Sequence, residues 1–334
     1  MSHYLAKRTA RVLFTVYLVA TFTFGMIRLL PGGPLTTLRV KLARQGMDPD
    51  QINAYIENYQ NIRPDATLLE QYQSYMLSVA GGDLGRSISL DEPVTNVLAE
   101  AVPWTVFVVV VSTVLMFAFA IVFGAMMAYW EGSRFDQALT GVSIVSASVP
   151  FYVLALLLVY FLGYQYQVLP TGGTTGLAVE KELSVPFVMS ALEHAILPVA
   201  SFTVTGMGVQ ALAMRGNSIQ VLGEDYVRVA RLRGLADRRI ATRYVGRNAI
   251  LPMYTGFLLL LGFNLGGTII LERIFSYPGL GFYMFKALKA RDYPLMMGTF
   301  LVITVALVVG AYVADLTYSK VDPRISSGGS DEAY

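Results

Sequence analysis

Residues suited to specific recognition gather in one basic stretch, 215–248, which lies between two long apolar runs. Glu224 and Asp225 stand where the positive end of a helix macrodipole favours acidic side chains. A run of helical spacing starts at Tyr226, and Gly234 can end it, because glycine readily adopts the left-handed conformation found just past a helix. The stretch therefore predicts a short helix that is suited to binding.

This short helix would carry a small apolar face with a basic surround. Spacings of three, four and seven residues place four side chains on that face: Tyr226, Val229, Ala230 and Arg233. Three arginines lie mostly off it: Arg228, Arg231 and Arg238. Such a helix either lies on anionic lipid headgroups or docks into a groove of a soluble protein. The helical pattern alone does not separate these two interpretations.

Patterns for catalysis or metal binding are few in this sequence. The chain has no cysteine, and its two histidines, His3 and His194, lie far apart, so we expect no thiolate or histidine metal cluster. No lysine of a phosphate-binding loop follows the glycine pairs Gly32-Gly33, Gly81-Gly82 and Gly172-Gly173. We therefore expect a chain that is not an enzyme and carries no cofactor of its own.

The composition places the chain in a lipid bilayer. Hydrophobic residues make up 54% of it and charged residues only 14%, whereas soluble domains carry roughly a quarter charged residues. The mean hydropathy of +0.53 agrees with this assignment. The net charge of +2 is too small to suggest binding to nucleic acid.

Long apolar segments predict an all-α polytopic membrane protein with about six transmembrane helices, because a spanning helix needs about 20 mostly apolar residues. The six segments are 9–30, 103–130, 138–163, 191–214, 250–271 and 295–318. The first has a basic start, but its apolar part is long for a signal sequence and no small-residue cleavage pattern follows, so we expect it to be retained.

The distribution of Lys and Arg near the helix ends favours a cytoplasmic location for both termini. The segment between the first two helices is then external and largely helical, with a helix start at Asp48 and Pro49 and a break at Gly81-Gly82. We expect the following division: an N-terminal helix (1–30), an external segment (31–102), a transmembrane core (103–318) that contains the cytoplasmic loop 215–248, and a cytoplasmic tail (319–334).

The loop resembles the cytoplasmic EAA loop of ABC importer permeases, in the version found in the dipeptide/oligopeptide permease family. Residues 224–235 and 247–252 carry this resemblance. Further motifs of the family follow in order along nearly the whole chain, at 29–34, 82–87, 148–151, 277–281, 290–294 and 322–324. Two departures stand out: Arg228-Val229-Ala230 replaces the E-A-A triplet and matches only its last residue, and Gly33 stands where the family usually has Asp.

The resemblance implies a permease subunit in the cytoplasmic membrane that carries substrates, most often di- or oligopeptides, while other polypeptides hydrolyse ATP. The loop would be a coupling helix, formed by Glu224, Asp225, Tyr226, Arg228, Ala230, Arg231, Gly234 and Leu235. The implied partners are two ATP-binding-cassette ATPase subunits that bind ATP and Mg, a second homologous permease and an extracytoplasmic substrate-binding protein. Relatives of this family also carry nickel complexes and oligosaccharides.

Two other functions remain open at this point. An ion-coupled secondary transporter usually has ionisable residues or broken helices at mid-span, and the second, third and sixth segments have essentially no such residues near their middle. Pro150 in the third segment predicts a kink, which is either structural or part of a gate. A membrane enzyme would need paired acids or a nucleophile with its base in a span, and the sequence offers no such pattern. Glu272 lies at the boundary of the fifth segment, where an acid can face water or act in function.

Overall fold

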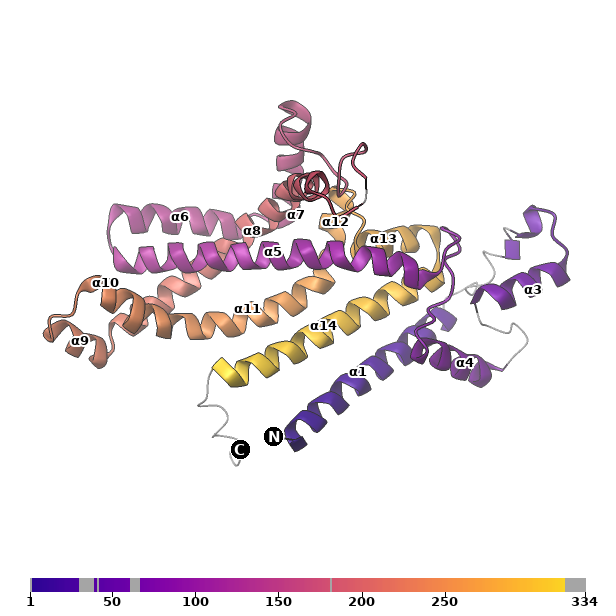
Figure 1. The fold of residues 1–334 in the computed structure, drawn as a ribbon, viewed down its shortest axis with the longest axis horizontal. Helices are drawn as coiled ribbons and strands as arrows, with labels where there is room; N and C mark the ends of the chain where they lie inside the picture. Colours follow the sequence, from indigo (N-terminus) through magenta and orange to yellow (C-terminus); the bar gives the residue numbers. More distant parts are fainter. Residues whose placement is uncertain (1, 30–38, 41, 61–66, 181, 322–334) are drawn as a thin grey trace. The chain divides into compact units, whose positions relative to one another are not determined.

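The computed structural model describes residues 2–29, 39–40, 42–60, 67–180 and 182–321 (Figure 1). Its described part is built from helices, turns and loops, and it has no strand beyond one isolated bridge between Arg86 and Pro93. The predicted all-α membrane fold is therefore confirmed. The motif at 322–324, most of the motif at 29–34 and most of the predicted tail 319–334 lie outside the described residues.

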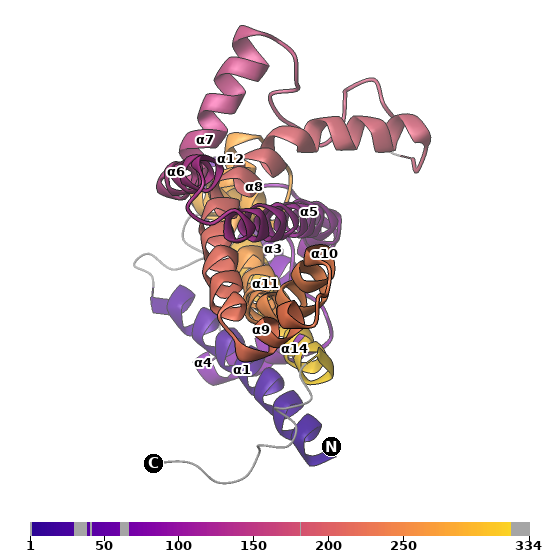
Figure 2. The ribbon, with the colours of Figure 1, turned by 90° about the vertical axis from the view of Figure 1, so that its left-hand side faces the viewer.

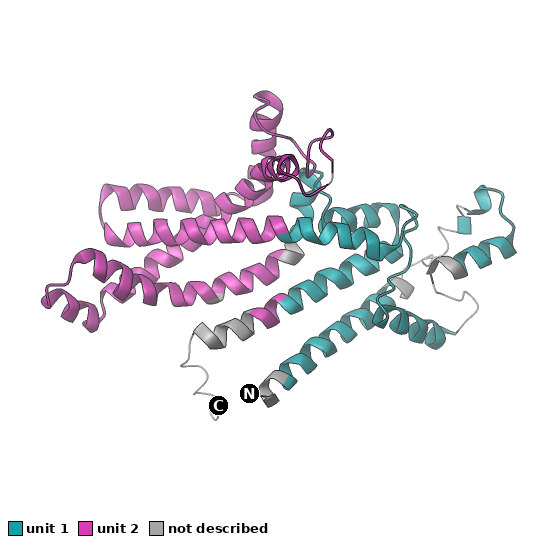
Figure 3. Ribbon diagram, viewed as in Figure 1, with its two compact units in different colours: residues 1–106, 265–309 teal, residues 107–264, 310–334 magenta. Residues whose placement is uncertain are grey.

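The chain forms two compact units, one of residues 1–106 and 265–309 and one of residues 107–264 and 310–334 (Figure 3). Two long helices contribute to both: α5 (Val94–Tyr129) and α14 (Tyr293–Val321). The first unit also contains α1 (Ser2–Leu29), α3 (Pro49–Gln60), α4 (Leu68–Ala80), α12 (Ile269–Ile274) and α13 (Leu280–Ala290). The second contains α6 (Arg134–Ser148), α7 (Phe151–Leu158), the π-helix η1 (Val159–Gln165), α8 (Val185–Leu222), α9 (Asp225–Leu232), α10 (Asp237–Arg239), the π-helix η2 (Ile240–Gly246) and most of α11 (Arg247–Gly267).

In the described part of the chain, four helices are long and apolar enough to cross a membrane. They are Ala6–Met26, Val94–Tyr129, Val185–Leu222 and Tyr293–Val313, and they fall on the first, second, fourth and sixth predicted segments. Most of the fifth segment is helical as α11, but side chains 255 and 265–267 within it lie outside the described set. The total of six spans and the side of both termini therefore stay predictions.

The third predicted segment, 138–163, is not one straight helix. α6 ends at Ser148, α7 begins at Phe151, and the two pieces are bent by 94° (Figure 2). Pro150 accounts for the break, because its ring disfavours helical geometry in the preceding residue, and Val149 accordingly has φ −88° and ψ 119°. The kink predicted at Pro150 is therefore present, and the two pieces form a broken span or a re-entrant segment.

In the segment predicted to be external, local sequence features explain where two helices begin. α3 begins at Pro49, as predicted. α4 begins at Leu68 because Thr67 and Glu70 form a capping box, in which the Thr67 amide donates to the Glu70 carboxylate at 2.8 Å and the Glu70 amide donates to the Thr67 hydroxyl at 3.4 Å. The predicted break follows at once, and Gly82 has a φ of +79°.

A buried carboxylate joins α12 and α13 to the N-terminal part of α5. Glu272 is only 1% exposed, so it does not face water. Its Oε1 atom accepts hydrogen bonds from the hydroxyls of Thr105 at 2.8 Å and Thr268 at 2.9 Å, and its Oε2 atom accepts from the Phe282 amide at 3.0 Å. A Cβ on Gly279 would lie 2.6 Å from Oε1, so the motif at 277–281 needs a residue without a side chain here.

A second carboxylate of this unit, Asp292, brings together two motifs that lie about 200 residues apart in sequence. Asp292 is fully buried. Its Oδ2 atom accepts from the Ser87 hydroxyl at 2.6 Å, the Ser89 amide at 2.8 Å and the Ser89 hydroxyl at 2.7 Å, and its Oδ1 atom accepts from the Leu295 amide at 3.2 Å. The motif at 82–87 is therefore fixed to the start of α14.

Glu272 gives a pH-dependent prediction. Burial raises the pKa of its carboxyl above the ordinary value of 4.5, although the hydrogen bonds from Thr105, Phe282 and Thr268 act in the opposite direction. A raised folded-state pKa contributes stability that is fully present below pH 4.5 and is lost as the pH rises through the folded pKa. Since Glu272→Gln removes this titration, we expect the variant to gain stability over the wild type as the pH rises.

The measurement is the midpoint of thermal unfolding of both proteins in detergent, across a pH series that starts well below the ordinary carboxyl pKa of 4.5 and rises through neutral pH. The low-pH end serves as the internal control, because the wild-type carboxyl is neutral there in both the folded and the unfolded state. A difference between the two midpoints that stays constant with pH would show that the buried carboxyl does not limit stability.

Candidate functional site

The predicted short helix exists, and it follows α8 directly. α8 extends to Leu222, and one tight turn at Gly223 leads into α9 (Figure 1). Glu224 occupies the N-cap position with extended backbone, and Asp225 lies in the first turn, where the helix macrodipole favours negative charge. The predicted left-handed residue is also present, since Gly234 has a φ of +70°.

One side of α9 is held by a small hydrophobic core of its own. Val227 and Ala230 are buried and pack with Ile240 and Val245 of η2. Leu235 packs against the same cluster as the chain turns back toward η2. The sequence grouped Ala230 with Tyr226 and Val229 on one face, but η2 covers Ala230. Because η2 folds back over α9, the predicted face is divided into a covered part, Ala230, and an open part, Tyr226 and Val229.

The open side of α9 carries an apolar stripe. Tyr226, Val229 and Leu232 are exposed, and Leu232 reaches 81% exposure. Their spacing of three residues places them along one side of the helix, and the exposed Arg228 and Arg231 lie off that stripe. An apolar stripe of this kind is a surface that a partner can cover.

A side-chain hydrogen bond fixes Tyr226 to the second part of the loop. Asn248 donates from Nδ2 to the Tyr226 hydroxyl at 3.0 Å and to the Tyr244 carbonyl at 2.8 Å. Asn248 belongs to the motif at 247–252, so the two halves of the sequence resemblance meet in space. The stripe is therefore supported both by the core beneath it and by this polar contact.

The surroundings of the stripe are basic. Between 223 and 248, the exposed arginines are Arg228, Arg231, Arg233, Arg238, Arg239, Arg243 and Arg247, against the exposed acids Glu224, Asp225 and Asp237. Seven positive and three negative side chains leave a surplus of four positive charges around an apolar centre. This arrangement suits a binding surface for a partner with apolar and acidic groups. It offers no nucleophile with a neighbouring base for catalysis.

The structure sorts the eight predicted site residues by what they do locally. Glu224 and Asp225 start the helix, Tyr226, Arg228 and Arg231 are exposed on it, Ala230 and Leu235 face the small core, and Gly234 makes the turn. Sequence reasoning missed Val227, the most buried residue of α9, and Leu232, its most exposed large hydrophobic residue. The three-residue step from Val229 to Leu232 was a visible signal for the second.

Comparisons with known proteins agree with this arrangement. Residues 120–327, which include α9 and η2, match the family described as "Binding-protein-dependent transport system inner membrane component". The oligopeptide transport system permease protein of Bacillus subtilis (strain 168) is 30% identical over 97% of this chain and 99% of its own length. The di/tripeptide transport system permease protein of Pseudomonas aeruginosa (strain UCBPP-PA14) is 29% identical, with the same coverage.

A solved structure supports the fold. An amino acid ABC transporter crystallised with histidines resembles the chain with a TM-score of 0.50, over 68% of this chain and 94% of the matched chain. The sequence identity is 14%, so this likeness concerns the fold alone.

The core beneath α9 gives a second prediction. Val227→Ala deletes about two methyl groups from a filled site, which costs about 1–2 kcal/mol. We expect amide hydrogen exchange in α9 to accelerate by about 5- to 30-fold, because local opening becomes easier by that amount. The measurement is hydrogen exchange of the detergent-solubilised protein, read by mass spectrometry on peptides that cover α9.

Leu232→Ala is the matched control, since it shortens an exposed side chain of the same helix. It should leave the exchange of α9 close to that of the wild type. Equal protection of α9 in the wild type and in Val227→Ala would mean that the small core does not hold this helix.

Proposed function

Because the chain belongs to the family of inner-membrane components of binding-protein-dependent transport systems, we propose that it is the permease subunit of an ATP-binding-cassette importer for di- or oligopeptides. The observation that carries the proposal is the open stripe of Tyr226, Val229 and Leu232 on a helix that has its own core. ATP, with Mg, binds to two separate ATPase subunits, and α9 is the segment that they move.

We expect the stripe to dock into a protein groove rather than on a lipid surface. The surplus of four positive charges suits anionic headgroups as well as an acidic groove, so it is the membership in a family of binding-protein-dependent transport systems that favours docking on a protein. A groove with an apolar floor and an acidic rim accepts both Leu232 and the neighbouring arginines. Tyr226 is already positioned by Asn248, which limits the loss of side-chain entropy on docking.

The transport cycle follows from two states of the assembly. Closure of the two ATPase subunits displaces α9, and the helices attached to it move as rigid pieces between inward- and outward-facing arrangements. A second homologous permease completes the pathway, and an extracytoplasmic binding protein delivers the substrate. The named relatives transport oligopeptides and di- or tripeptides, which supports a peptide substrate for this chain.

The docking of α9 gives a third prediction. Leu232→Asp replaces an exposed apolar side chain by a charge, so an interface that buries this leucine loses about 1.5–3 kcal/mol, which corresponds to about tenfold or more in affinity. We expect the variant to lose its ATPase subunits during purification from the native host in mild detergent. The measurement is the amount of ATPase subunit that is recovered with the tagged permease.

Leu288→Asp is the matched control, because Leu288 is another strongly exposed leucine on a short helix, α13, in the other unit. It should retain the ATPase subunits at the wild-type level. Equal recovery with Leu232→Asp and with the wild type would remove α9 from the docking interface.

Transport itself gives a fourth prediction. The complete complex, reconstituted in liposomes with its binding protein, should take up a labelled dipeptide or tripeptide when ATP is available to the ATPase subunits. Collapse of the proton and sodium gradients should leave this uptake unchanged. Uptake that needs an ion gradient and ignores ATP would favour the secondary transporter instead.

A further inference from the structure

The helices α6 and α8 are packed unusually closely within their unit. A Cβ atom on Gly208 of α8 would collide with the carbonyl oxygen of Ser143 and would lie 3.0 Å from the amide nitrogen of Ala147, both on α6. The Ser146 hydroxyl also donates to the Val204 carbonyl across the same interface. Small residues at such a crossing let the two backbones touch, and close packing of this kind resists sliding.

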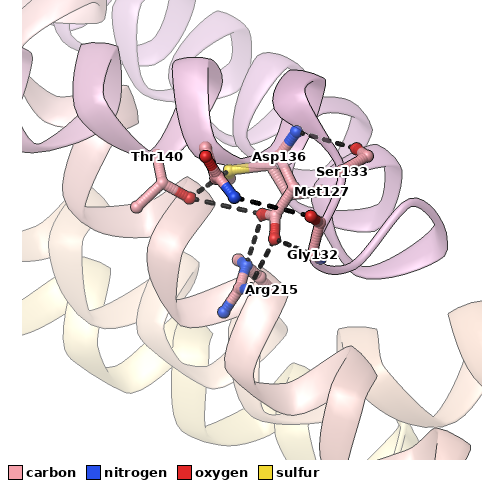
Figure 4. Close-up of polar contacts among 7 residues, drawn as sticks. Met127, Gly132, Ser133, Asp136, Thr140 and Arg215 are labelled. Carbon is pink, nitrogen blue, oxygen red and sulfur yellow. Dashed lines mark hydrogen bonds and ion pairs between the residues drawn. The ribbon is translucent and has the colours of Figure 1, made fainter.

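At one end, an ion pair joins the same two helices (Figure 4). Arg215 of α8 donates from Nε to Oδ1 of Asp136 at 2.7 Å and from Nη2 to Oδ2 at 2.8 Å. Asp136 is only 3% exposed, and it accepts further hydrogen bonds from the Gly132 amide at 3.0 Å and the Thr140 hydroxyl at 3.3 Å. A bidentate, largely buried pair with these extra donors fixes both distance and direction.

The contacts share one antiparallel register. From the ion pair to the Ser146 contact, the residue number rises by 10 on α6, from 136 to 146, and falls by 11 on α8, from 215 to 204. The contacts therefore extend along most of α6. The ion pair anchors the end of this interface where α8 runs on toward α9.

The helices α8 and α6 each lead to a different element. Seven residues beyond Arg215, α8 ends at Leu222 and turns into α9. At its other end, α6 stops at Ser148, just before the 94° bend into α7. The α6–α8 pair thus connects α9 to the bend at Pro150.

We propose that Asp136 and Arg215 are positioning residues for energy coupling, an inference that rests on the proposed function. Their ion pair fixes α8 to α6, so that a displacement of α9 reaches the bend before α7. Without the ion pair, α8 would still be packed against α6 at Gly208, but its end near Arg215 could bend away from α6 and absorb part of that displacement. The role of the pair is then to set how much transport follows from each ATP.

The test measures peptide uptake and ATP hydrolysis in the same liposomes, with the complete complex and its binding protein. We expect Asp136→Asn and Arg215→Gln to lower the number of peptides imported per ATP by about fivefold or more, the size of an ordinary coupling between two sites. The double variant should be no worse than either single one, because both act through one contact. Arg215→Lys keeps the charge without the bidentate geometry and should give an intermediate ratio.

Arg134→Gln is the matched control, since it removes an exposed arginine from the first turn of α6 and leaves the pair intact. The number of peptides that this variant imports per ATP should equal that of the wild type. If the ion pair has a purely structural role, uptake and hydrolysis fall together in Asp136→Asn and Arg215→Gln. An unchanged number of peptides imported per ATP in these two variants and in Arg215→Lys would overturn the inference. Absence of ATP-driven uptake in the wild type would instead overturn the proposed function.

Discussion

Water does not reach a fully buried polar group, so such a group requires a partner inside the protein to offset the cost of its burial. Helices meet this requirement for the backbone. Three carboxylates meet it separately: Asp136 by a guanidinium with an amide and a hydroxyl, Glu272 and Asp292 by hydroxyls and amides. Each of them fixes segments that are distant in sequence, because its donors come from other elements. Polar satisfaction thus determines which helices stay together within each unit.

Close packing likewise holds helices together, in addition to the buried carboxylates. Gly208 permits α8 to touch α6, and a Cβ on Gly281 would lie 2.5 Å from the Cα of Ile269 where α13 returns to α12. Such contacts leave little freedom for sliding, so motion concentrates where regular structure is interrupted. In the unit that carries α9, the clearest interruption is at Val149 and Pro150, where the backbone leaves helical geometry for one step.

Local chemistry made much of this fold predictable. Pro49 begins α3 and Gly234 turns left-handed because each property belongs to the residue itself. The T-x-x-E pattern from Thr67 to Glu70 would have given the start of α4 as well. The size of the bend at Pro150 could not be predicted, since it depends on what α7 packs against. Nor could the Asp136–Arg215 pair, whose partners lie 79 residues apart with no local signal.

The departure of this loop from the E-A-A triplet has a physical explanation in the burial of α9. Ala230, which matches the motif, is buried against η2, and the matching Gly234 needs its positive φ. Arg228 and Val229, which depart from the motif, are exposed. Burial and backbone conformation thus constrain the positions that match the motif. The positions that depart from it, Arg228 and Val229, are on the side of α9 that a partner would cover. The loop can therefore change its recognition chemistry while α8 and α9 keep the geometry that joins them, because different residues carry the two tasks.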